Sequence, residues 1–330
     1  MIAMTKDQSR WGFACGRISV LTGQLMPFDY YLALAGLERV EEMFHRLQDT
    51  SLREYMFPGA ITWEDWSSII DAYVDELIAS LRRDCPAPVL ADMFALSEDY
   101  LNLKRAVLNR TPFPFIPRVF SEDRLLEVAA GMPNLLPDVI RPAVAQLAAL
   151  GTNGQDLVTI DLVLDGAYLR HYLALARAVN APAVLAWATE RVLSKSVSAL
   201  WRALRAGMNR KEFEQRFLPI DGITGILRDI LEAGEPQTWG GVIPGPLGDA
   251  FRESLESPVE EQIARFEHLA SNHLTELARQ SKLQTMGPER VSGFLWGLWV
   301  EAFNMKLVIS GKLNHIDSEA LRVRVRETYV

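Results

Sequence analysis

Apolar residues recur along this chain with the spacing of one face of an α-helix. One stripe is separated alternately by three and four positions: Met93, Leu96, Tyr100, Leu103 and Val107. Because an α-helix has about 3.6 residues per turn, these positions share one side of it. The stripe therefore predicts an amphipathic helix over residues 93–107 with one buried face.

A second stripe repeats the first at a constant offset of 202 positions: Leu295, Leu298, Ala302, Met305 and Ile309. Polar residues keep the same offset. We call these polar residues the repeat marks: Asp99, Asn102 and Lys104 in the first copy, Glu301, Asn304 and Lys306 in the last. A shared apolar stripe with shared polar positions indicates two copies of one helical segment.

A third, weaker copy lies between these two. Its apolar residues stand 97 positions after their counterparts in the first copy: Leu193, Val197, Leu200 and Leu204. Ser196, Ala199 and Trp201 occupy the places of the repeat marks. A segment that keeps its apolar face and loses its polar positions is typical of a repeated core helix.

Each copy is expected to contain a leading helix as well. Ile160-Asp161 with Asp165 has the pattern aliphatic, acid, three residues, acid, and Leu255-Glu256 with Glu260 repeats it. In the first copy the candidates are Glu64, Asp65 and Asp71. We therefore expect three helical units, at about residues 1–115, 116–218 and 219–330. A period near a hundred residues is too long for a solenoid repeat and predicts triplicated helical bundles.

Signals for β-strands are weak throughout, so the predicted fold class is all-α, with three tandem pseudo-repeated helical bundles. Several helix ends are marked. Ser121 is expected to cap one helix, and Asp317 or Ser318 another, because short polar side chains accept bonds from the first backbone N–H groups. Gly131 and Gly234 are expected to end helices, as glycine commonly does.

Composition narrows the classes of function. The chain has 330 residues, 49% of them hydrophobic and 23% charged, with a net charge of −8 and a pI of about 5.3. This balance argues against general nucleic-acid binding, which requires a basic surface. Cys15 and Cys85 form no C-x-x-C pair, so no zinc or redox motif is present. The opening residues lack the apolar core of a signal peptide, and the most apolar run, 291–300, is too short to span a bilayer.

Candidate catalytic and metal-binding motifs are incomplete. Glu42 and His45 form an E-x-x-H, but a di-metal site of the ferritin type needs a second copy, which is missing. The glycine-rich stretch 239–249 lacks the Lys-Ser/Thr of a phosphate-binding P-loop. We expect no catalytic residue, cofactor, metal or direct nucleotide site. For the repeat marks we expect a structural role, since catalytic residues rarely recur in each copy of a repeated unit.

The C-terminal segment 287–330 resembles that of the C subunits of V-type and A-type ATP synthases, which are relatives of the eukaryotic d subunit. That family ends with Gly-Pro, an apolar helix, an acid-x-x-Asn-Leu-Lys/Arg segment, Gly-Lys and a short helix close to Tyr-Val. The matching residues here are Gly287-Pro288, Glu301, Asn304-Met305-Lys306, Gly311-Lys312 and Tyr329-Val330. The segment 11–26, with Arg17 and Leu21 through Leu25, is similar to the family's opening helix.

The resemblance implies a rotor component without catalytic activity. Members of the family consist of three similar helical domains arranged as a funnel on the cytoplasmic face of the membrane proteolipid ring. The funnel receives the D and F subunits of the central stalk and transmits torque. Trp63, Trp66 and Trp239 are candidates for contacts with these partners, unless they pack inside. Two other interpretations stay open: a helical metal-dependent enzyme and a generic helical scaffold.

Overall fold

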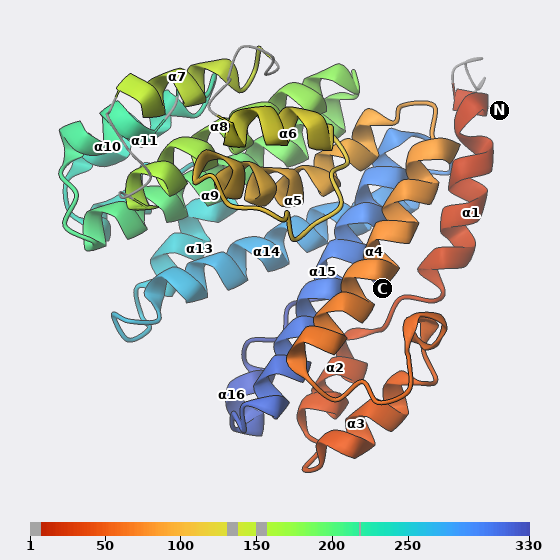
Figure 1. Ribbon diagram of the computed structural model, residues 1–330. Helices are drawn as coiled ribbons and strands as arrows, with labels where there is room; N and C mark the ends of the chain where they lie inside the picture. Colours follow the sequence, from red (N-terminus) through yellow and green to blue (C-terminus); the bar gives the residue numbers. More distant parts are fainter. Residues whose placement is uncertain (1–7, 131–137, 150–156, 218) are drawn as a thin grey trace. The chain divides into compact units, whose positions relative to one another are not determined.

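The computed structural model describes residues 8–130, 138–149, 157–217 and 219–330. In these ranges the regular structure consists of α-helices and short 3-10 turns, and no β-strand is present (Figure 1). The predicted all-α fold class is confirmed. None of the helices in the described ranges is long and apolar enough to cross a membrane.

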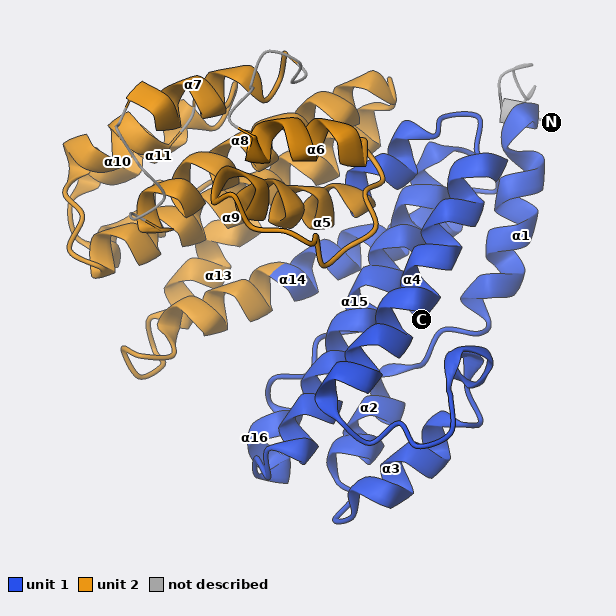
Figure 2. Cartoon of the chain, in the orientation of Figure 1, with its two compact units in different colours: residues 1–94, 271–330 blue, residues 95–270 orange. Residues whose placement is uncertain are grey.

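The chain forms two compact units (Figure 2). Unit 1 comprises residues 1–94 and 271–330, and unit 2 comprises residues 95–270. Both divisions fall inside a helix, the first in α5 (Val89–Val107) and the second in α14 (Gln262–Gln280). The three repeat units expected from the sequence, 1–115, 116–218 and 219–330, stay a prediction.

Unit 1 is built on the contact between its two long helices, α4 and α15, which lie side by side (Figure 1). A capping box starts α4: Thr62 accepts the N–H of Asp65, whose carboxylate accepts the N–H of Thr62. Trp66 and Trp296 are fully buried in this unit. In addition to parts of α5 and α14, its elements are η1 (Gln8–Trp11), α1 (Gly12–Thr22), α2 (Phe28–Ala35), α3 (Val40–Leu47), η2 (Ser51–Tyr55), α4 (Trp63–Asp84), η4 (Ser281–Leu283), α15 (Pro288–Leu313) and α16 (Ser318–Arg322).

Unit 2 is built on an antiparallel pair of long helices, α8 and α9. Asn180 makes the tight connection between them with a positive φ of 56°, a conformation that asparagine tolerates better than most residues. The elements that lie entirely in this unit are α6 (Glu122–Ala129), α7 (Arg141–Ala149), α8 (Leu157–Ala178), α9 (Pro182–Arg205), α10 (Arg210–Arg216), α11 (Thr224–Ala233), α12 (Pro236–Trp239) and α13 (Pro246–Ser254).

The three predicted apolar stripes lie on three long helices, α5, α9 and α15. Their members are buried, apart from Val107, Leu204 and Ala302, which are half-buried. Burial of about 25 cal/mol per Å² of apolar surface is the main force that holds such helices in a core. The prediction of three helices with one buried stripe each is confirmed.

The predicted helix ends have mixed outcomes. Asp317 accepts the N–H groups of Glu319 and Ala320, and Gly234 ends α11 with a φ of 84°, so both predictions are confirmed. Ser121 stands at the N-cap of α6, but its side chain makes no capping bond. Gly131 lies outside the described residues.

The predicted leading helix of the last copy is wrong. Glu256 and Glu260 lie in the turn between α13 and α14, because Pro258 has no N–H group and interrupts the helical pattern. The long helix that precedes α15 is α14, which begins at Gln262. Asp161 and Asp165 do lie on a long helix, α8, and so does Asp71, on α4.

Candidate functional site

The repeat marks occupy buried or half-buried positions on α5 and α15. The acid of the first copy, Asp99, is buried in unit 2. Its carboxylate accepts the N–H of Val119 at 2.8 Å and the N–H of Arg118 at 3.1 Å. Asp99 therefore ties α5 to the extended segment that precedes α6.

The acid of the last copy, Glu301, is buried in unit 1 and binds different partners. Its carboxylate accepts the N–H of Met26 at 2.8 Å and the hydroxyl of Tyr73 at 3.0 Å. Burial raises the pKa of Glu301 to about 7, against the opposing effect of these two hydrogen bonds. Glu301 thus joins the connection between α1 and α2 to helices α4 and α15.

The two asparagines make the same pair of bonds in both copies. The side chain of Asn102 donates to the carbonyl of Phe115 at 2.9 Å and accepts the N–H of the same residue at 3.3 Å. Asn304 makes both bonds to the backbone of Arg326, each at 2.9 Å. Each asparagine is fully buried and holds one residue of an extended segment in a fixed register.

The two lysines form ion pairs with leading helices. Lys104 contacts Asp161 at 2.9 Å and Asp165 at 2.8 Å on α8, and Lys306 pairs with Asp71 on α4. Burial lowers the pKa of Lys104, but the two carboxylates outweigh this effect and the net shift is upward. The lysines of the first and last copies therefore link their helices to leading helices that carry predicted acids.

The middle copy replaces this polar chemistry with packing. Trp201, at the lysine position, lies in an aromatic cluster with Trp239, Phe251 and Phe266, at ring-centroid distances of 6.1, 4.6 and 6.5 Å. Phe266 belongs to α14, so the contact with a leading helix persists without charge. Ser196, at the acid position, is fully buried.

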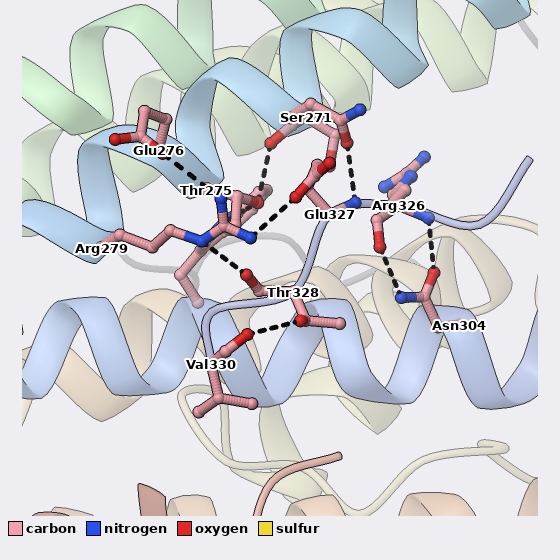
Figure 3. Close-up of polar contacts among 11 residues, drawn as sticks. Ser271, Thr275, Glu276, Arg279, Asn304, Arg326, Glu327, Thr328 and Val330 are labelled. Carbon is pink, nitrogen blue, oxygen red and sulfur yellow. Dashed lines mark hydrogen bonds and ion pairs between the residues drawn. The ribbon is translucent and has the colours of Figure 1, made fainter. Parts of the chain in front are cut away.

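The C-terminal tail (residues 325–330) lies in a groove between α14 and α15 (Figure 3). Asn272 accepts the N–H of Glu327, and Arg279 both pairs with the Glu327 carboxylate at 2.8 Å and donates to the carbonyl of Thr328. On the other side, the guanidinium of Arg326 stacks on the ring of Phe303. The groove accommodates Tyr329 because Gly297 has no side chain: a Cβ there would lie 2.6 Å from the Cβ of Tyr329.

The corresponding groove between α8 and α9 contains a pocket of about 430 Å³. Its floor includes Leu162, Leu169 and Ala203, while Asp161 and Asp165 line the α8 side, and Lys195 and Arg202 line the α9 side. Ala199, the counterpart of Asn102 and Asn304, also lines the pocket and is half-buried.

The candidate metal-binding and partner-contact residues from the sequence lie outside the two grooves. Glu42 and His45 are both exposed on α3, and in the described ranges no cluster of three potential metal ligands occurs. Trp66 and Trp239 are fully buried, so neither provides a contact surface, whereas Trp63 is half-buried. The indole of Trp239 donates to the carbonyl of Gly234, and its ring belongs to the aromatic cluster, so the first residue of the glycine-rich stretch has a packing role.

Sequence reasoning missed several residues of these networks. Met26, Tyr73, Asn272 and Arg279 gave no signal, because each meets its partner only through the tertiary fold. The matching pairs of hydrogen bonds that Asn102 and Asn304 make could have been suspected, since both residues recur on a buried face and each is followed by an extended segment.

Fold and contacts together define an all-α protein in which buried polar residues at repeated positions tie extended segments to long helices. Residues 14–324 match the model of a family described as ATP synthase (C/AC39) subunit. The chain is also similar to the C subunit of the V-type sodium ATPase of Enterococcus hirae, with 20% identity over 320 residues, which cover 93% of this chain and 95% of the relative. The chain belongs to the family of C subunits of V-type and A-type ATP synthases.

Proposed function

We propose that this chain is a non-catalytic rotor component of a V-type or A-type ATP synthase. It sits on the cytoplasmic face of the proteolipid ring and forms the socket for the D and F subunits of the central stalk. The observation that carries the proposal is the family match over residues 14–324, together with a relative of nearly equal length that is named as the C subunit of a V-type sodium ATPase.

The contacts of the repeat marks support a mechanical role. A protein that transmits torque must resist deformation, and close-packed helices with low compressibility do so. Asn102 and Asn304 each make two hydrogen bonds to one backbone residue, and these bonds add directional restraints. A shift of the bound segment by one residue would break both hydrogen bonds. These features favour a stiff connector between two partners.

A non-catalytic role is supported by the way the marks use their polar groups. The carboxylates of Asp99 and Glu301 and the amides of Asn102 and Asn304 bind groups of the chain itself. A general acid or base must instead reach a substrate atom within hydrogen-bond distance. The buried positions of these four residues suit restraint of the fold rather than turnover.

The socket role is tested by mixing the purified chain with a purified D–F complex at micromolar concentration and separating the mixture by gel filtration. We expect the three polypeptides to elute together in equal amounts. Because the chain carries a net charge of −8, an unrelated helical protein of similar charge is the control for non-specific attraction to basic surfaces. Separate elution of the chain in low salt would contradict the socket role.

The rotor role is tested in vesicles that contain the complete ATPase or a complex assembled without this chain. We expect ATP-driven transport, measured for both Na⁺ and H⁺, to require the chain, while ATP hydrolysis by the catalytic head persists without it. Full transport by the complex that lacks the chain would contradict torque transmission.

A further inference from the structure

The α8–α9 groove is open at the positions where the other copies of the helix are covered. Asn102 lies beneath Phe115, and Asn304 beneath Arg326, and both asparagines are fully buried. Ala199 takes their place on α9, is half-buried, and lines the pocket of about 430 Å³. The middle copy thus presents to solvent a helix face that its two sister copies use to hold an extended segment.

A second register position shows the same difference. Gly311 of α15 is covered by Leu321, since a Cβ on Gly311 would lie 2.2 Å from a methyl carbon of Leu321. The counterpart of Gly311 is Ala206, which directly follows the last residue of α9, is exposed and also lines the pocket. At these two positions, about two turns apart, the residues that the C-terminal segment covers on α15 therefore have more exposed counterparts at Ala199 and Ala206.

The two rims of the α8–α9 groove carry opposite charges. Asp161 and Asp165 on α8 have side chains that are 60% and 48% exposed, and the two carboxylates share one cation, Lys104, which also lines the pocket. Arg202 on α9 is 56% exposed and contacts Glu267. Between the rims, Leu162 and Ala203 form an apolar floor. A ligand that complements this groove carries a basic group towards α8, an acidic group towards α9 and a small apolar group between them.

The filled groove shows which kind of ligand has this form. In the C-terminal tail, neighbouring residues Arg326 and Glu327 send a base towards α15 and an acid towards α14 (Figure 3). Side chains of an extended chain alternate in this way. The signs are reversed in the α8–α9 groove, where the acidic rim is on the leading helix. The tail of the chain itself is held between α14 and α15 and does not supply the occupant.

We propose that the α8–α9 groove binds an extended segment of a partner polypeptide that carries adjacent basic and acidic residues. On the helix pair α8–α9, this segment occupies the place that the C-terminal tail occupies on α14 and α15. Its carrier is a neighbouring component of the rotary ATPase, so this inference rests on the proposed function.

The test compares two alanines of α9. Ala199→Trp fills the pocket, whereas Ala183→Trp adds the same side chain at an exposed position at the start of the helix. Binding of each variant to the purified D–F complex and to ring-containing membranes is measured. We expect Ala199→Trp to weaken binding by about tenfold or more, and Ala183→Trp to bind as the unaltered chain does. Equal binding by all three proteins would overturn the proposal and leave the proposed function intact.

A second pair of variants tests the basic rim. Arg202→Ala removes a charge from the groove, and Arg205→Ala removes one from the same helix end outside it. We expect only Arg202→Ala to weaken binding, by about three- to tenfold, with a smaller difference in high salt. An equal effect of the two variants would show that any loss of affinity comes from general electrostatic attraction, and it would contradict binding in the groove.

Cross-linking identifies the occupant even where a filled pocket impairs folding. A photoreactive benzoyl-phenylalanine at position 206 is irradiated in the assembled complex, and the linked peptides are identified by mass spectrometry. A link to an extended segment of a stalk or ring protein supports the proposal. A link to a second copy of this chain, or none in an assembled complex, overturns it. If the unaltered chain binds neither D–F nor the ring, the proposed function fails as well.

Discussion

Helices α15 and α9 carry matching apolar stripes, yet different chemistry holds the two helices in place. On α15, buried Glu301 and Asn304 bind backbone groups of the segments around Met26 and Arg326. On α9, the aromatic ring of Trp201 packs into a cluster instead. Hydrogen bonds demand particular atoms and thereby fix register, whereas apolar burial is non-directional. An apolar stripe therefore suffices to keep a helix in the core. The polar repeat marks in addition fix the register of the extended segments that pack on that helix.

Removal of the aromatic anchor of α9 is expected to have the largest effect. Trp201→Ala leaves a cavity between Trp239, Phe251 and Phe266, and such truncations cost about 3–5 kcal/mol. The free energy of unfolding, measured in urea, checks this value. Trp63→Ala is the control, because Trp63 is only half-buried. Equal losses in the two variants would show that α9 does not depend on this cluster.

The acid of α15 predicts a pH dependence that α9 lacks. Burial raises the pKa of Glu301 to about 7 from an ordinary value of 4.5, so the folded chain keeps a proton that the unfolded chain has released. Stability from this group is present below pH 4.5 and is lost as the pH rises to about 7, with a total of about 3 kcal/mol. Glu301→Gln is expected to remove this loss, measured as the free energy of unfolding at pH 5 and pH 8.

The control for this prediction is Glu256→Gln, since Glu256 is exposed in a turn. His171 works in the opposite direction: burial, with a smaller effect of Arg170, lowers its pKa to about 4. The contribution of His171 to the free energy of unfolding is therefore lost as the pH falls below about 6.5. The difference between variants cancels the His171 effect, because it is common to all of them. A slope unchanged by Glu301→Gln would mean that Glu301 titrates as an ordinary surface acid.

The fold was accessible from the sequence where it depends on local periodicity. The stripes around Leu103, Leu200 and Met305 specify three buried helix faces, and a face needs only the spacing of apolar residues. The recurring marks Asn102 and Asn304 were also recognisable, by their equal spacing from the stripes. Their binding partners were not, because Arg326 lies in no pattern and is reached only when the chain turns back after α16.

The partners of Glu301 illustrate why the rest was out of reach. Its carboxylate meets Met26 across 275 positions of sequence and Tyr73 across 228. No spacing rule connects residues so far apart, and neither Met26 nor Tyr73 belongs to a repeated pattern. The mistaken helix at Glu256 has a local cause: two acids at helical spacing also occur by chance in an acidic chain, and Pro258 between them was the better guide.

Loss of the register bond on α15 is expected to have an intermediate effect. Asn304→Ala removes both bonds to the backbone of Arg326, at a cost of about 2 kcal/mol. Amide hydrogen exchange in the C-terminal tail should accelerate at the same time. Asn314→Ala is the matched control, because Asn314 is exposed at the C-cap of α15 and its side chain donates to the nearby carbonyl of Ser310. Unchanged exchange in the tail would show that Arg279 and Asn272 hold it without Asn304.

The smallest effect is expected from the lysine position, where the middle copy has dispensed with charge altogether. Lys104→Met keeps most of the aliphatic stem and removes the ion pairs with Asp161 and Asp165, whose side chains are about half exposed. Exposed ion pairs contribute about 0–1 kcal/mol, and salt screens them. We therefore expect a loss of about 1 kcal/mol in low salt that shrinks in about 1 M NaCl. Lys211→Met, at an exposed site on α10, is the control. A larger loss that salt leaves unchanged would indicate that packing of the stem, and not its charge, joins α5 to α8, as the ring of Trp201 joins α9 to α14.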